Sequence, residues 1–169
     1  YSGSLSKSLV VDHLDNRGTE EFIKRLGELW IKEIYPNKPT NFFIDSFELI
    51  GELPWSEKLF DAFNEMHGYS IKPYLPLLFK KNGESKYLYA IFGEEFSFRS
   101  QNNVRERVYE DYLLTRQHLF MNEFLLPMKN WINSYDIKLR LQAHGGYGNY
   151  LDSYSIADIP AVSYTHLTL

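Results

Sequence analysis

Three short apolar runs, each ending in polar residues, place the strongest limits on how this chain can fold. They are SLVVDHLD at 8–15, NFFIDSFE at 41–48 and IKLRLQAHGG at 137–146. In the third run apolar and polar residues alternate, which is the two-residue period of a strand. ADIP at 157–160 is expected to begin a fourth strand. Helical patterns separate the runs, and strands that alternate with helices form parallel sheets with the helices packed outside.

Apolar residues recur at helical spacing between these runs. One helix is expected to begin at Gly18-Thr19, and a second to be capped by Ser56. A long helix is expected over 104–134, with a kink at Pro127, because proline lacks the amide hydrogen and clashes with the preceding turn.

The fold class that follows is α/β, either an open doubly wound sheet or a partial (β/α)8 TIM barrel. A barrel uses about 250 residues for eight units. This chain of 169 residues has room for about three to four βα units and a long helical excursion at 70–104. On the barrel interpretation, residues 1–161 are a fragment of the domain and work with the remainder of a parent chain. Residues 162–169 look like translated adapter sequence and are expected to be a non-native tail.

Charge and composition exclude several classes of protein. The net charge is −4 with no basic block, which argues against a groove for nucleic acid. The chain has no cysteine, so disulfides, thiolate metal sites and cysteine nucleophiles are excluded. No run approaches the roughly 18 apolar residues of a membrane span. Aromatic residues make up 17% of the chain, and they suit a core and a sugar-stacking surface equally well.

Polar side chains gather where the predicted strands end, which is the functional edge of a parallel sheet. The first run ends in Asp12 and His13, and the second ends in Asp45 and Glu48. The carboxyl ends of parallel strands meet at one edge. These side chains are therefore expected to lie near one another.

The third run adds three polar groups at the same edge. Arg140, Gln142 and His144 fall at i, i+2 and i+4, so they are expected on one face of the strand. A guanidinium, an amide and an imidazole on one wall can hydrogen-bond several hydroxyls at once. Trp55 and Tyr147, on loops at this end, are candidates for stacking on a ring. The combination indicates a site for a polyol or sugar.

Each of these groups also has a structural interpretation. Asp12, Asp15 and Asp45, taken singly, are as well suited to capping a helix or joining an ion pair. Arg140 can serve simply to neutralise Asp45.

Other ionisable residues are interpreted as structural. His67 and His118 lie in helical patterns and are expected to be surface or packing residues. Asp111 and Arg116 are expected to form a solvated or interhelical pair. The sequence has no dinucleotide fingerprint, P-loop, GxSxG elbow or histidine spacing typical of zinc.

A set of motifs occurs in a defined order over residues 8 to 160. They are DHLD at 12–15, IDSFE at 44–48 followed by Trp55, HGYSIKPYLP at 67–76, YEDYLLTR at 109–116, LRLQAHG at 139–145 and ADIP at 157–160. This ordered set resembles glycoside hydrolase family 106 and related bacterial proteins of the α-L-rhamnosidase type.

The resemblance implies a (β/α)8 catalytic domain of a glycosidase from a larger chain, inactive as this fragment alone. The implied reaction is inverting hydrolysis of terminal α-L-rhamnosyl or similar residues of plant or microbial polysaccharide, with calcium at the site and a periplasmic or secreted location. Glu48 is then a catalytic carboxylate, the general acid, and Asp45 supports it or binds sugar. The residues expected to contact the substrate are Asp12, His13, Trp55, Arg140, Gln142 and His144.

An inverting mechanism needs a second carboxylate about 6.5–9.5 Å from the first. No acid follows Asp158 in this chain, so the second acid is expected in a segment that the chain lacks, with Asp158 itself as the alternative. The alternative function is a non-catalytic carbohydrate-binding protein on the same barrel, and a third is a lyase or esterase acting on polysaccharide.

Overall fold

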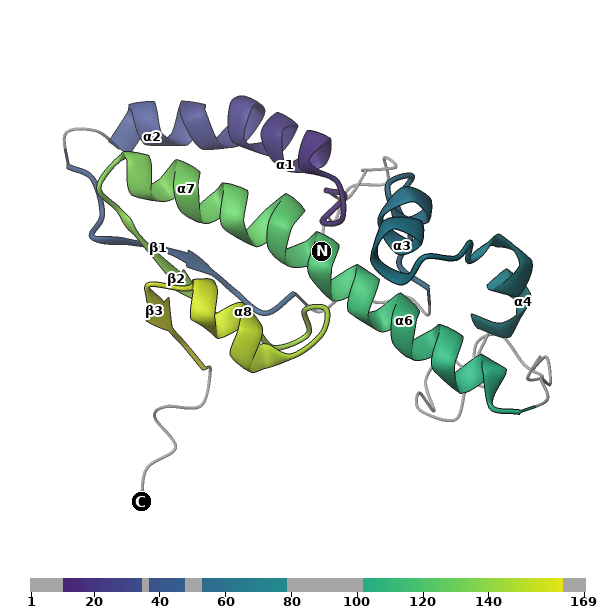
Figure 1. Ribbon diagram of the computed structural model, residues 1–169. Coiled ribbons are helices and arrows are strands. Elements are labelled where there is room, and N and C mark those ends of the chain that lie inside the picture. The colour runs from purple at the N-terminus through teal and green to yellow at the C-terminus, as the bar shows by residue number, and fades with distance from the viewer. Residues whose placement is uncertain (1–10, 35–36, 48–52, 79–101, 163–169) are drawn as a thin grey trace, which may run out of the picture.

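In the part of the chain that the structure describes, three short parallel strands form one sheet. The computed structural model describes residues 11–34, 37–47, 53–78 and 102–162 (Figure 1). The strands are β1 (Asn41–Ile44), β2 (Lys138–Leu141) and β3 (Ile159–Pro160), in the spatial order β1-β2-β3. The predicted α/β class with parallel strands is confirmed. The described strands form a small open sheet and do not close a barrel.

The strand predicted at 8–15 does not form in residues 11–15, the part of this run that the structure describes. Residues from Val11 onward form no strand, and a turn at His13 leads into a helix. The reason lies in two carboxylates that bind backbone amides. Asp12 Oδ1 accepts from Leu14 N at 2.9 Å, and Asp15 Oδ1 accepts from Arg17 N at 2.9 Å. Such local bonds compete with a strand ladder for the backbone. Residues 8–10 lie outside the described ranges.

The first helix begins earlier than expected, because Asp15 and not Thr19 is its cap. It runs through α1 (Asn16–Phe22), a wide π-type turn η1 (Ile23–Gly27) and α2 (Glu28–Ile34). Gly27 lies where a Cβ would come within 2.6 Å of the Trp131 ring, so the glycine permits a close helix–helix approach.

One long helix spans 104–134, as predicted. It consists of α6 (Val104–Leu119), a π-type turn η3 (Phe120–Leu125) and α7 (Leu126–Ser134), which Figure 1 shows as one uninterrupted rod. A wide π-type turn directly precedes Pro127, the position where a kink is expected. A π turn shifts the hydrogen-bond ladder by one residue, which accommodates a position without an amide hydrogen.

A second helical unit lies between β1 and the long helix. It contains α3 (Leu59–His67), η2 (Lys72–Tyr74) and α4 (Leu75–Leu78). Helix α3 begins three residues after the predicted cap: the Ser56 hydroxyl is buried without a hydrogen-bond partner, and its backbone carbonyl accepts from Leu59 N at 3.1 Å. Gly68 ends α3 with φ of +73°, as its position predicted.

The two faces of the sheet differ in what covers them. Leu139 and Leu141 are fully buried on the face that α7 contacts, whereas Lys138 and Arg140 are exposed on the other. The alternation predicted for this strand is therefore confirmed. Phe43 of β1 keeps 46% of its surface exposed. Helix α8 (Tyr150–Ile156) leads from β2 to β3.

Candidate functional site

Asp45 and His144 lie at the same end of the sheet. The pairing of β1 with β2 continues past the strands: Gln142 N donates to Ile44 O at 2.9 Å, and Phe47 N donates to His144 O at 3.1 Å. Asp45 and His144 are both exposed. The side chain of Asp45 accepts from Ser46 N at 2.7 Å. The structure thus brings together the polar ends of two of the predicted strands.

The predicted wall of three polar groups on β2 is not formed as one surface. Gln142 is buried, at 4% exposure, while Arg140 and His144 are exposed, because the regular strand ends at Leu141 and the next residues leave its alternation. Arg140 does not pair with Asp45. Its guanidinium lies 5.2 Å from the ring centroid of Phe43, its cross-strand neighbour.

Asp12 and His13, in the loop before α1, lie at the same end of the sheet as Asp45. The His13 ring packs edge-on against Phe124 at 4.5 Å and against Phe47 at 5.8 Å. Burial lowers the pKa of His13, and the neighbouring Asp12 carboxylate opposes that shift. Burial among aromatic side chains therefore favours the neutral form of the His13 ring.

Aromatic rings form a floor beneath this end of the sheet. Phe120 contacts Phe47 at 5.0 Å and Tyr147 at 5.4 Å. Tyr147 has Arg116 over its ring at 4.7 Å, so one of its faces is already covered. Burial raises the pKa of Tyr147, Arg116 opposes this, and Asp12 adds to it. These electrostatic contacts link Asp12, Tyr147 and Arg116 into one cluster.

Trp55 belongs to a segment that the long helix anchors. Tyr112 donates its hydroxyl hydrogen to Pro54 O at 2.7 Å. Trp55 is 38% exposed as a residue, and its ring packs edge-on against Phe60 of α3 at 4.9 Å. Its exposed part is available for stacking, although no described contact joins it to Asp45 or His144.

Glu48, the predicted general acid, lies outside the described residues. Residues 163–169 of the expected tail also lie outside them. The alternative second acid, Asp158, is described, and it lies at the opposite end of the strands from Asp45. Asp158 precedes β3, level with Leu139, and accepts from Leu139 N at 2.8 Å. In the register of the sheet, Asp158 lies two strands away from Asp45 and three residues before it along the strand direction. At about 3.3 Å per residue and about 4.8 Å per strand, the backbones of the two residues are roughly 14 Å apart.

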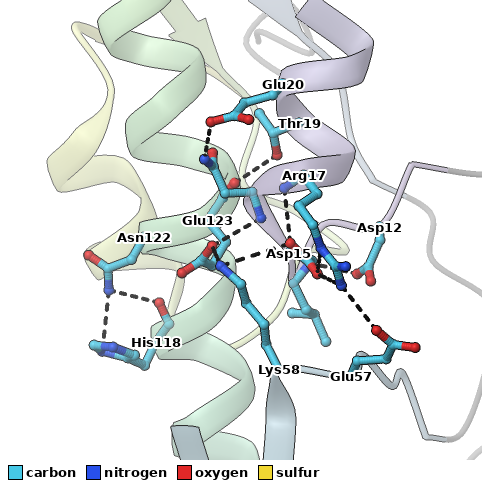
Figure 2. Close-up of polar contacts among 12 residues, drawn as sticks. Asp12, Asp15, Arg17, Thr19, Glu20, Glu57, Lys58, His118, Asn122 and Glu123 are labelled. Atoms are coloured by element: carbon cyan, nitrogen blue, oxygen red, sulfur yellow. Dashed lines mark hydrogen bonds and ion pairs between the residues drawn. The ribbon is translucent and has the colours of Figure 1, made fainter. Parts of the chain in front are cut away.

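An ion network fastens the loop before α1 to the rest of the molecule. Figure 2 shows Lys58 reaching Glu123 at 2.5 Å, while Arg17 binds Asp15 at 2.5 Å and Glu57 at 3.1 Å. Hydrogen bonding from Arg17 lowers the pKa of Asp15, whose side chain is only 4% exposed. Every carboxylate of the network has a cation or amide partner, which indicates a structural role for Asp15.

A second network was missed by sequence reasoning. His67 Nε2 lies 2.9 Å from Thr115 Oγ1, and its Nδ1 lies 3.5 Å from Asp111 Oδ1, the order of groups in a hydrolase triad. Thr115 is fully buried, however, and its hydroxyl donates to Asp111 O at 2.8 Å. Tyr69 donates to the Asp111 carboxylate at 2.7 Å. A nucleophile must reach substrate, so this network is structural. The expected pair of Asp111 with Arg116 is not formed.

Two classes of feature are absent from the described ranges. No three His, Asp or Glu side chains of the described residues come together at one place. The implied calcium stays a prediction, because calcium also takes backbone carbonyl and amide oxygens. Within the same residues, no helix combines the length and apolar character needed to cross a membrane.

The fold is similar to part of a solved glycosidase. A rhamnosidase from Novosphingobium sp. PP1Y superimposes with a TM-score of 0.63 and 22% sequence identity, over 89% of this chain and 14% of that one. The chain matches no known family model, and it matches no curated protein. At this identity the likeness establishes a similarity of fold alone, and it does not single out family 106.

Proposed function

We propose that this chain is part of a glycoside hydrolase that removes terminal α-L-rhamnosyl or similar residues, with inversion of configuration. The observation that carries the proposal is the likeness of fold, over 89% of the chain, to a rhamnosidase. The proposal is supported by the way β1 and β2 deliver Asp45 and His144 to one end of the sheet, where parallel α/β folds hold their sites.

The chemistry follows from the residues at that end. Glu48, three residues after Asp45, is the proposed acid that protonates the leaving oxygen, and Asp45 with His144 binds sugar hydroxyls. Water attacks from the opposite face of the sugar with help from a second carboxylate. Asp158 lies at the opposite end of the strands from Asp45 and His144 and is held there by Leu139 N and Lys129. We therefore place the base in the remainder of a longer chain, and the segment then acts as one wall of a shared site.

The test uses the longer protein in which this segment naturally occurs. It is expected to release rhamnose from 4-nitrophenyl α-L-rhamnopyranoside, with the β anomer as first product by NMR. Glu48→Gln is expected to lower kcat by about 10²–10⁴-fold, the usual contribution of a general acid. Glu65→Gln, at an exposed position of α3, is the matched control and keeps the wild-type rate. Binding of rhamnose without turnover favours the carbohydrate-binding alternative, and a wild-type rate in Glu48→Gln refutes the assignment of the acid.

A further inference from the structure

A pocket of about 670 Å³ lies between α6 and the glycine-rich loop that follows β2. Gly148 has φ of +89°, and a side chain there would collide with Gln117, so the glycine brings the loop against the helix. Gln117 holds the loop in turn: its Oε1 accepts from Asn149 N at 3.0 Å and its Nε2 donates to Asp152 at 2.6 Å. These two hydrogen bonds hold the loop and the start of α8 against α6, and so they fix the shape of the pocket.

Arg116 is the cation in this pocket. Its guanidinium is held over the rings of Tyr147 and Tyr112, at 4.7 and 5.6 Å. Its Nε is buried and has no hydrogen-bond partner, and no ion pair joins it to a described carboxylate. A guanidinium has five N–H donors, and a buried donor without a partner lowers stability. The guanidinium carries further N–H donors besides the buried Nε, and because Arg116 lines the pocket a bound group with oxygen acceptors would pair with those.

The other walls fit the body of a sugar. Tyr150, a residue that is 44% exposed, lines the pocket, and the His144 ring lies 5.9 Å from the Tyr150 ring. Leu114 lines it as well and is 54% exposed. Apolar and aromatic surfaces of this kind stack on the C–H face of a pyranose ring. Glu110, on the same lining, is an acceptor for hydroxyl groups.

We propose that this pocket binds a uronate, that is, a sugar carrying a carboxylate. The carboxylate pairs with Arg116, where planar two-point hydrogen bonding is available, and the ring lies against Tyr150 and Leu114. The loop that forms the pocket also carries His144, so the bound uronate lies at the same end of the sheet as Asp45. As a subsite for a neighbouring acidic sugar of the substrate, the pocket rests on the proposed function. The binding of a uronate by the pocket does not itself depend on the proposed function.

The test is calorimetric titration of this chain with D-galacturonate, D-galactose and acetate at low salt. Galacturonate is expected to bind about tenfold or more tightly than galactose, since a charge-assisted hydrogen bond contributes about 1.5–3 kcal/mol. Acetate is expected to bind more weakly than galacturonate, because it lacks the ring. Equal affinity for galacturonate and galactose overturns the proposal, and so does equal affinity for galacturonate and acetate.

Four variants test whether the preference for galacturonate over galactose arises at Arg116. Arg116→Gln is expected to abolish the preference for galacturonate, and Glu110→Gln to strengthen galacturonate binding severalfold by removing a repelling charge. Leu114→Glu is expected to abolish the preference without disturbing the packing of Arg116. Arg107→Gln removes the same charge from an exposed position of the same helix and is expected to change nothing. Retention of the preference in both Arg116→Gln and Leu114→Glu overturns the site.

Failure of this proposal is distinct from failure of the proposed function. If the longer protein releases no rhamnose while galacturonate still depends on Arg116, only the proposed function is refuted. If rhamnose is released while galacturonate shows no preference, only the uronate site is refuted.

Discussion

Thr19 donates its hydroxyl hydrogen to the backbone carbonyl of Glu123 at 2.7 Å. Pro127 stands four residues after Glu123 and has no amide hydrogen, so the usual helical donor for this carbonyl is missing. A side chain from α1 supplies the donor instead. The sequence distance between the two residues is 104, and the contact ties the first helix to the wide turn of the long one.

Thr19→Val is expected to lower the free energy of unfolding by about 1–3 kcal/mol. Valine keeps the shape of threonine, but it leaves the Glu123 carbonyl without its donor. Thr40→Val, at an exposed position, is the control and is expected to change stability by less than about 0.5 kcal/mol. Urea denaturation measures both variants, and equal midpoints for the two contradict the assignment.

Asp15→Asn is expected to weaken the acid sensitivity of folding. The Asp15 carboxyl has a pKa below its ordinary 3.8, because Arg17 hydrogen-bonds it. The folded state therefore keeps the carboxylate ionised to lower pH than the unfolded state does. This stabilisation is present above pH 3.8 and is lost as the pH falls through the lower folded pKa. Asparagine preserves the helix cap without the charge.

Urea midpoints measured from about pH 5 to pH 2 follow the effect of Asp15. The wild type is expected to lose more stability over this range than Asp15→Asn does. Asp61→Asn, at an exposed site, is the control and should follow the wild type. Parallel curves for wild type and Asp15→Asn rule out this role.

His13→Phe is expected to stabilise the protein relative to the wild type as the pH falls. Burial holds the pKa of His13 below 6.5, so the unfolded chain takes up the proton first. Wild-type stability therefore declines from pH 6.5 downward until the lower folded pKa is passed. Phenylalanine fits the ring contacts with Phe124 and cannot be protonated. Thermal unfolding at pH 8 and pH 5 measures the difference, with His118→Gln, at an exposed site, as control.

Asp158→Asn is expected to reduce stability by about 1 kcal/mol and to leave the turnover of the longer protein unchanged. The carboxylate accepts from Leu139 N and lies 3.2 Å from Lys129 Nζ, contacts that join β3 to the sheet and to α7. Comparison of kcat with that of Glu48→Gln separates the two roles. A loss of kcat in folded Asp158→Asn as large as that in Glu48→Gln refutes a purely structural Asp158.

Patterns that span many residues were predictable from the sequence. The alternation around β2 and the helical period over 104–134 each repeat over several side chains, so local exceptions do not hide them. The stretch ending at Asp12 and His13 was not predictable in the same way. Its apolar residues fit a strand, and the side-chain bonds of Asp12 and Asp15 that turn the chain depend on which amide each carboxylate meets.

The same distinction holds for the candidate site. That Asp45 and His144 share one end of the sheet follows from parallel pairing alone. The burial of Gln142 follows from the chain leaving the strand after Leu141, and the pocket at Arg116 follows from the path of a glycine loop. An arginine in a helical pattern, next to a loop with three glycines, was the available signal for that pocket.

The wide turn at 120–125 changes the direction in which the side chains before it point, relative to those after it, within one continuous helix. A turn that holds one extra residue rotates everything before it by about 100° relative to everything after it, since an α-helix advances by 3.6 residues per turn. The α6 face that carries Arg116 therefore owes its direction to η3, several residues away. Deleting a single residue from this turn would leave the helix intact and swing the guanidinium away from Tyr147, so a ligand pocket can be gained or lost by a one-residue change outside the residues that line it.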